Sequence, residues 1–265
     1  MRTLLYKNNL PAIFFILFLL ALWKILSFWV DAAIIIPAPE ETLKTCFRLI
    51  LQPGFPTKIW HTVARSLGGF FIALFSALGL GIIAGTYKPV YNLFKPLVSI
   101  TKATPTMSII LLALIWLHTE IAPILVGFLV IFPLLYTNIV EGIRTVDIKL
   151  LEMAGIYRVK KRRIISEIYL PSLSSYLTAG VATAMGLNLK VVIAAEVLSQ
   201  PRDCIGTSLY MEQINLNTAG VFAWTIIAIL ISSSFDYSLN LLRKRIEKWT
   251  PPKPHRLKQN AIYRR

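Results

Sequence analysis

The sequence has few of the residues that catalysis and metal binding require. Its only cysteines are Cys46 and Cys204, and its three histidines are scattered, without the spacing of a metal or redox site. It contains no P-loop motif, no HExxH and no GxSxG, and none of its 13 glycines is followed by lysine. We therefore expect no enzyme activity, metal or cofactor in this chain. Any chemistry of ATP and magnesium would belong to a partner.

Charged residues are also scarce. They make up 15% of the 265 residues, whereas 55% are hydrophobic and the mean hydropathy is +0.63. This apolar share is above that of ordinary soluble domains. The net charge of +15 could suggest a nucleic-acid partner, but the basic residues lie at the borders of apolar runs and in a tail, without interleaved aromatics. We expect a membrane protein that does not bind nucleic acid.

Six apolar runs are long enough to cross a bilayer, which takes about 20 residues of helix. They cover residues 10–30, 63–84, 97–117, 121–140, 176–198 and 220–242. Short strands of alternating polarity, the signature of a membrane barrel, are absent. The sequence therefore predicts an all-α, polytopic membrane protein with six transmembrane helices. We expect residues 1–265 to form one transmembrane domain.

The basic residues are unevenly distributed between the two sides of the predicted membrane. Of the 28, twenty fall in segments on the same side as the N-terminus, including seven in the loop 141–171 and nine in the tail 243–265. Only four fall in segments on the other side. Because positive charge is retained on the cytoplasmic side, both termini and this loop should be cytoplasmic.

A short helix is predicted on the outer side, between the first two apolar runs. Leucine and phenylalanine recur at helical spacing over residues 40–51, after a Pro-Ala-Pro sequence and before Pro53-Gly54. This amphipathic helix would lie at the lipid headgroups or contact a partner. Cys46 lies on it and Cys204 also falls outside the membrane, so the sequence leaves open whether the two cysteines are free or paired.

The loop 141–171, between the fourth and fifth apolar runs, has a regular pattern. Asp147 suits a helix N-cap, and apolar residues share one helical face over 148–154. After the basic run 160–163, a second apolar face leads to Pro171, which we expect to end the helix. Two short amphipathic helices with a bend are predicted, and their apolar stripe must be covered by lipid or protein. The basic run also suits anionic headgroups.

Two stretches of this loop resemble a known family. Glu152-Met153-Ala154, followed at a matching distance by Ile168-Tyr169-Leu170-Pro171, resembles the EAA loop of ABC importer permeases, whose pattern runs Glu-Ala-Ala, a Gly, then Ile-x-Leu-Pro. In that family the loop forms the coupling helix, which sits in a groove on the ATP-binding subunit. The resemblance implies this docking role for Glu152, Ala154, Gly155, Arg158, Leu170 and Pro171. Arg158 stands where the family usually has glycine, and Gly155 lies three residues earlier.

The resemblance spans nearly the whole chain and narrows to the permeases of the nitrate, sulfonate, taurine and bicarbonate group. The supporting stretches are residues 34–39, 138–147 and 190–198, followed by Ile205-Gly206. It implies a permease subunit of a bacterial inner-membrane importer. Such a subunit assembles as a homodimer, or with a similar permease, together with two ATP-binding subunits and an external solute-binding protein.

Four basic residues fall inside the predicted spans, where ionisable groups are costly. Lys24 can extend to the interface and Arg65 would sit at a helix start, so both have structural explanations. Lys102 precedes a polar, kinkable stretch, and Lys190 interrupts the fifth span, so either could face a solute path; pairing of Lys190 with Glu196 is the structural alternative. The resemblance implies that these two spans line the path, which gives the candidate residues Lys102, Thr104, Pro105, Ser108, Asn188, Lys190 and Glu196.

Cations on the path suit a small anionic solute such as sulfonate, nitrate or bicarbonate. Related permeases also move neutral nitrogenous compounds such as vitamin precursors, so that alternative stays open. A stand-alone secondary transporter would need its own coupling-ion site and an internal repeat, and neither is evident. A membrane-embedded enzyme would show clustered His, Asp or Glu near one interface, which the scattered histidines do not provide.

Overall fold

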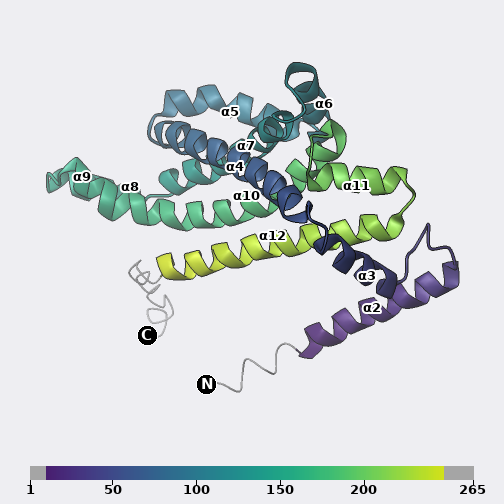
Figure 1. Ribbon diagram of the computed structural model, residues 1–265. Coiled ribbons are helices and arrows are strands. Elements are labelled where there is room, and N and C mark those ends of the chain that lie inside the picture. The colour runs from purple at the N-terminus through teal and green to yellow at the C-terminus, as the bar shows by residue number, and fades with distance from the viewer. Residues whose placement is uncertain (1–9, 248–265) are drawn as a thin grey trace.

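The computed structural model describes residues 10–247, and every regular element within them is a helix. Long helices run side by side through the middle of the molecule, and shorter ones lie at its ends (Figure 1). The elements are α2 (Leu10–Val30), α3 (Pro39–Ile50), α4 (Phe55–Thr86), α5 (Lys88–Ala103), α6 (Thr106–Trp116), α7 (Ala122–Arg144), α8 (Ile148–Ile156), α9 (Lys161–Ile164), the π-helix η1 (Ile165–Tyr169), α10 (Leu170–Ser199), α11 (Ile205–Ile214) and α12 (Thr218–Glu247). The all-α prediction is confirmed. Arg2, Lys7 and the tail beyond Glu247 lie outside the described residues.

The core lies where α4, α7 and α10 meet. Ala77, Leu135 and Ala184, one from each helix, have no exposed surface. Small residues let the helices approach closely, as is usual for membrane helices. A Cβ atom added at Gly69 on α4 would lie only 2.8 Å from the carbonyl oxygen of Ile124 in α7. Gly69, Gly81 and Gly85 of α4 therefore serve helix packing, whereas a Cβ atom at Gly79 would meet nothing within 4 Å.

Four helical stretches are long and apolar enough to cross a membrane: α4, α7, Arg162–Ser199 and Thr218–Phe235. The bent pair α5 and α6 would add a fifth crossing, and Phe14–Val30 within α2 is a shorter apolar helix. All six predicted apolar runs thus coincide with helical structure. The count of six crossings stays a prediction.

The third predicted span, residues 97–117, is not one helix. It breaks at Thr104 and Pro105, and α5 and α6 meet there at an angle of 99°. Pro105 has no N–H to continue the helix, and its ring keeps Thr104 extended, at φ −70° and ψ 127°. The kink expected at this stretch is present, but as a break between two helices and not as a bend within one. Pro133, in contrast, is buried inside an unbroken α7.

The prediction that Pro171 ends a helix is wrong. The chain stays helical from Arg162 to Ser199, with Pro171 in the first turn of α10. Immediately before it, η1 forms a wider turn in which the Leu170 N–H donates to the carbonyl of Ile165. A proline normally crowds the carbonyl four residues earlier, and a π turn at this point relieves the crowding.

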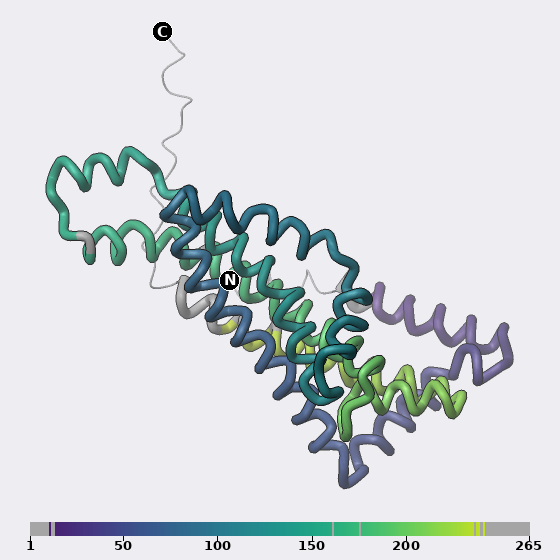
Figure 2. Tube along the Cα trace, turned by 90° about the horizontal axis from the view of Figure 1, so that it is seen from above, coloured from purple at the N-terminus to yellow at the C-terminus, as the bar shows by residue number. Residues whose placement is uncertain are grey.

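The predicted outer helix is present as α3, and α2 is joined to it by a few polar contacts. Trp23 Nε1 donates to the Pro37 carbonyl at 3.0 Å, and Lys24 Nζ lies 2.7 Å from a carboxylate oxygen of Glu40. Both charged side chains are exposed, and the hydrogen bond from Lys24 holds the pKa of Glu40 below its usual value. Figure 2 shows α2 set apart from the central helices. Lys24 is thus paired at the surface.

The two cysteines are free and buried. Cys46 belongs to an apolar cluster that also contains Trp224 of α12, whereas Cys204 is the N-cap of α11, where its sulfur accepts from the Thr207 N–H. Burial raises the pKa of the Cys204 thiol to about 11, so this thiol stays protonated at neutral pH. The open question of a disulfide is answered: Cys46 packs as a small apolar residue, and Cys204 caps a helix.

Candidate functional site

The loop predicted to carry function projects from one end of the helical bundle. Helices α8 and α9 form a hairpin-like excursion beyond the ends of α7 and α10 (Figures 1 and 2). Asp147 is the N-cap of α8, as predicted, and its carboxylate accepts a hydrogen bond from the Lys149 N–H at 2.9 Å. Of the two predicted short helices, the first is present as α8 with a bend after it, whereas the second is not separate, because α9 continues through η1 into α10.

Helix α8 presents apolar side chains to the surroundings. Ile148, Ile156 and Tyr157 are 67%, 80% and 76% exposed, and Met153 is also exposed. Ala154 is the only buried residue that α8 contains. An apolar surface on a projecting helix is unfavourable in water and indicates that another surface covers it.

Arg158 makes the turn after α8 in the left-handed conformation, with φ at 50°. The Val159 N–H donates to the Ala154 carbonyl at 2.9 Å, and the Arg158 N–H to the Gly155 carbonyl at 3.0 Å. This arrangement is one that glycine usually adopts at a helix end. An L-residue adopts this conformation at a cost of about 1 kcal/mol or more. The turn lies where the resembled family places its glycine, but here Arg158 makes it. Gly155 itself lies inside α8.

The other residues of the docking prediction lie on the same projection or at its base. Glu152 is exposed and forms no ion pair with any residue in the described part of the chain. Leu170 is 57% exposed, and Pro171 is half-buried. Beside them, a basic hollow of about 580 Å³ opens between the two arms of the loop, lined by Tyr157, Arg158, Val159, Lys160, Arg162, Arg163 and Ser166.

A buried ionic cluster lies toward the opposite end of α10. Glu196 is fully buried, and its carboxylate lies 3.1 Å from Nη1 of Arg65 on α4. Nη2 of the same guanidinium contacts Glu120, in the loop between α6 and α7. The Thr62 hydroxyl donates to Glu196 at 2.8 Å, and the Gly206 N–H donates to it at 3.2 Å. One guanidinium thus connects three separate parts of the chain.

One prediction about this cluster is wrong, and one alternative left open by the sequence is excluded. Arg65 does not sit at a helix start, because α4 begins ten residues earlier, at Phe55. Glu196 pairs with Arg65 and not with Lys190. A carboxylate within an apolar run does require a cation, and this is the signal that the sequence offers. The sequence does not tell which cation pairs with Glu196, because Arg65 and Glu196 are 131 residues apart.

Glu120 was not identified from the sequence. Burial raises the pKa of its carboxyl, but hydrogen bonds from the Arg202 N–H and from Arg65 outweigh this effect and leave the pKa below its usual value. Glu120 therefore stays ionised at neutral pH. It anchors the backbone at Arg202, which precedes α11, to Arg65 of α4.

Asn188 also lies in the interior. Its side-chain amide donates to the carbonyl and the hydroxyl of Ser66, at 2.6 and 3.0 Å. A Cβ atom on Gly127 of α7 would lie 2.7 Å from the Asn188 side-chain oxygen. Asn188 therefore fills the contact between α4, α7 and α10.

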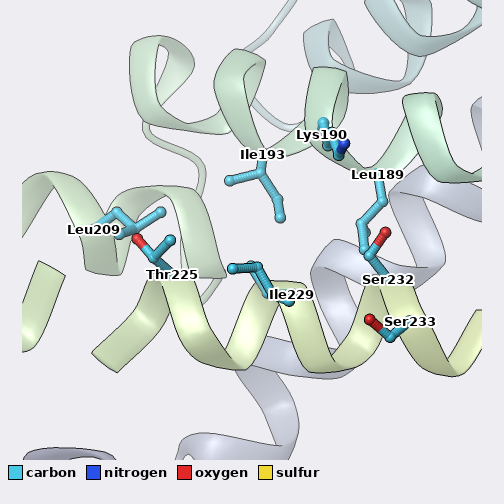
Figure 3. Close-up of a pocket in the computed structure, with 9 residues that line it drawn as sticks. Leu189, Lys190, Ile193, Leu209, Thr225, Ile229, Ser232 and Ser233 are labelled. Carbon is cyan, nitrogen blue, oxygen red and sulfur yellow. The ribbon is translucent and has the colours of Figure 1, made fainter. Parts of the chain in front are cut away.

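Lys190 is exposed and lies at a cavity of about 430 Å³ between α10 and α12. Figure 3 shows α10 residues on one side of this cavity and α12 residues on the other. The lining is apolar apart from Lys190 and the hydroxyl groups of Thr225, Ser232 and Ser233. Lys190 has no carboxylate partner within the described residues, so its charge is available to a ligand or to another chain.

The structure does not bring Lys102 to the Lys190 cavity. Lys102 lies in the last turn of α5, at a separate cavity of about 320 Å³ between α5 and α7. Thr104 and Pro105 form the break after α5, and Ser108 is exposed on α6. The seven candidate path residues are therefore divided between the buried interior of the chain and two surfaces.

Comparisons with known proteins agree with this fold. The family described as the binding-protein-dependent transport system inner membrane component matches residues 77–248. The putative aliphatic sulfonates transport permease protein SsuC of Bacillus subtilis is 26% identical over 91% of this chain and 86% of its own length. The bicarbonate transport system permease protein CmpB of Synechococcus elongatus is 27% identical over 69% of each chain. A solved structure of the MetNI methionine ABC transporter in an inward-facing conformation has a TM-score of 0.63 at 11% identity, covering 73% of this chain and 96% of that one.

The buried pair leads to a first prediction. Arg65→Met should destabilise the protein by about 3–5 kcal/mol, because it leaves the Glu196 carboxylate buried without its cation. The double variant Arg65→Met with Glu196→Gln should recover much of the loss, since the buried charge is removed and the carboxylate that loses its cation, that of Glu120, is 49% exposed. Lys24→Met is the control, because it removes a cation from an exposed pair that is worth about 0–1 kcal/mol. Thermal unfolding of the purified proteins in one detergent gives the comparison, and equal stability of Arg65→Met and Lys24→Met would contradict it.

Proposed function

Since the chain belongs to the family of binding-protein-dependent transport system inner membrane components, we propose that its projecting loop docks on a separate ATP-binding subunit and couples ATP hydrolysis to solute movement. The chain is the permease component of an ABC importer. The loop of this proposal, called the docking loop below, comprises residues 145–171. Its docking residues are Glu152, Ala154, Gly155, Arg158, Leu170 and Pro171.

One observation carries this proposal: α8 exposes an apolar face beside an unpaired carboxylate, at the far end of a projection. The exposed side chains of Ile148, Ile156 and Tyr157 supply the area that docking would bury. Glu152 supplies a charge that a cation on the partner can meet. An apolar centre with charged groups around it is the usual composition of a protein interface.

The partners follow from the family and from what this chain lacks. We propose two ATP-binding subunits, which hold ATP and magnesium, because the sequence contains no phosphate-binding loop. A second copy of this chain would complete the membrane part, and an external solute-binding protein would deliver the solute. The docking loop and both chain termini would then be on the cytoplasmic side of the bacterial plasma membrane, and the basic residues of the loop support that side.

We propose a small anionic solute of the sulfonate, nitrate or bicarbonate kind. The relatives named for sulfonate and bicarbonate transport support this class. So does the exposure of Lys102 and Lys190 without carboxylate partners in the described chain, because a neutral solute would leave both ammonium groups uncompensated. In this proposal the α5–α6 break and the cavity beside Lys190 line the path, whereas Asn188 and Glu196 hold the path helices in place.

Glu152→Lys tests docking. We expect the stability of the permease to change little, because Glu152 is exposed and exposed charges contribute about 0–1 kcal/mol. Recovery of the ATP-binding subunit should fall about a hundredfold, because reversing a charge at an interface places like charges together at a cost of several kcal/mol. The measurement is pull-down of the co-expressed ATP-binding subunit, with substrate-stimulated ATPase activity measured in membranes.

Glu41→Lys is the matched control for this experiment. Glu41 is also exposed on a short helix, α3, which lies at the opposite end from the docking loop, so the same change in net charge is made there. It should leave recovery and ATPase stimulation at the wild-type level. If Glu152→Lys assembles and couples as well as Glu41→Lys, the docking assignment is wrong.

Lys190→Met tests the solute path, because methionine keeps the bulk of the side chain and removes its charge. We expect uptake of the anionic solute into proteoliposomes to fall about tenfold, as a charge-assisted contact is worth about 1.5–3 kcal/mol. Lys44→Met, on the exposed surface of α3, should not change uptake. Uptake of sulfonate, nitrate and bicarbonate by the wild-type protein is measured first, in parallel. Unchanged uptake by a folded Lys190→Met protein would remove Lys190 from the path.

A further inference from the structure

The cavity between α5 and α7 gathers positive charge. Lys95 and Lys102 are seven residues apart on α5, so both lie on the helical face that lines it, and Arg144 reaches it from the end of α7. Its volume of about 320 Å³ is at the small end of ligand sites. It lies on the flank of the bundle from which the docking loop emerges, since α8 follows α7 directly.

The charges of this cavity are not balanced within the described chain. Glu141 is the one carboxylate in the lining, and neither it nor any other carboxylate lies within ion-pair distance of Lys95, Lys102 or Arg144. Arg144 instead packs over the ring of Tyr91, 3.9 Å from the ring centroid. This contact fixes the guanidinium at the cavity and leaves its hydrogen-bond donors available.

Tyr136 provides a second, independent observation. It lines the same cavity and is only 3% exposed, yet its hydroxyl has no hydrogen-bond partner. A buried hydroxyl without a partner costs about 1–3 kcal/mol, so such groups are rare unless a ligand or water satisfies them. The ring itself is held by Phe94 and Phe132, at 6.2 and 5.8 Å between centroids. The hydroxyl is therefore fixed in place and has no hydrogen-bond acceptor among the described residues.

We propose that this cavity binds an oxyanion, a phosphate or sulfonate group, with the hydroxyl of Tyr136 donating to it and Lys95, Lys102 and Arg144 neutralising it. An oxyanion accepts several hydrogen bonds and meets both needs at once, the missing acceptor and the missing negative charge. A neutral ligand would meet only the first, and water would leave three cations uncompensated. The same chemistry is offered by the headgroup of an anionic phospholipid and by a free oxyanion. The site goes beyond the proposed function but shares Lys102 with the proposed path, so its test uses Lys95 and Tyr136, which the path assignment does not include.

The test uses the full-length protein in two kinds of nanodisc. In discs of phosphatidylcholine alone, thermal unfolding is followed while sodium sulfate, sodium phosphate or a short alkanesulfonate is added, with sodium chloride of equal ionic strength as the reference. In discs containing phosphatidylglycerol, native mass spectrometry counts the anionic lipids that stay bound. Stabilisation in the first arm identifies a free oxyanion, and retained lipid in the second identifies a headgroup. Either result supports the proposal.

Three variants separate binding from folding. Lys95→Gln and Tyr136→Phe should each weaken binding about tenfold, as measured by stabilisation with the added oxyanion or by retention of the anionic lipid. Without any anion, Tyr136→Phe should be at least as stable as the wild type, because it removes a hydroxyl that has no partner. Lys88→Gln, at the exposed start of α5 and outside the cavity lining, should bind within about twofold of the wild type. The proposal is overturned if the wild type responds in neither arm, or if Lys88→Gln weakens binding as much as Lys95→Gln does.

Discussion

The contact between Arg65 and Glu196 is the constraint on which much of this structure depends. A fully buried carboxylate is tolerated in an apolar helix only when a cation and further donors satisfy it, and Arg65, Thr62 and the Gly206 N–H do so. Because these partners come from α4 and from the start of α11, the register of both against α10 is fixed. Glu120 extends the same constraint to the loop between α6 and α7. The position of α6, the second helix of the bent pair, therefore depends through Arg65 on a charge in α10.

The two ends of α10 differ in how firmly they are held. One end carries the buried ionic cluster, and the other continues through η1 into the docking loop, where α8 has almost no buried surface of its own. A helix of 30 residues is about 45 Å long, so α10 joins the two ends as one rigid element. If the docking loop moves with an ATP-binding subunit, as we propose, α10 and α7 are the elements that carry the movement toward Lys190 and the ion cluster.

Local patterns in the sequence predicted much of this fold and of the docking loop. The apolar runs, the short helix after the first of them, the cap at Asp147 and the bend near Arg158 all depend on neighbouring residues, and all are present. The errors concern effects that local patterns do not contain. Pro105 breaks its span, whereas Pro133 and Pro171 lie in continuous helices, the latter directly after a π turn, and the sequence alone does not separate these cases. The partner of Glu196 and the open hydroxyl of Tyr136 depend on packing between distant segments.

The most direct test of the central claim, that the docking loop contacts an ATP-binding subunit, is photo-crosslinking from the exposed face of α8. A photoreactive phenylalanine analogue replaces Met153, which is 49% exposed, in membranes that contain the co-expressed ATP-binding subunit. The same analogue at Leu43, 52% exposed on the outer helix α3, reports on non-specific capture. We predict a covalent adduct with the ATP-binding subunit from position 153 and none from position 43. Adducts with that subunit from both positions, or from position 43 alone, would contradict the account.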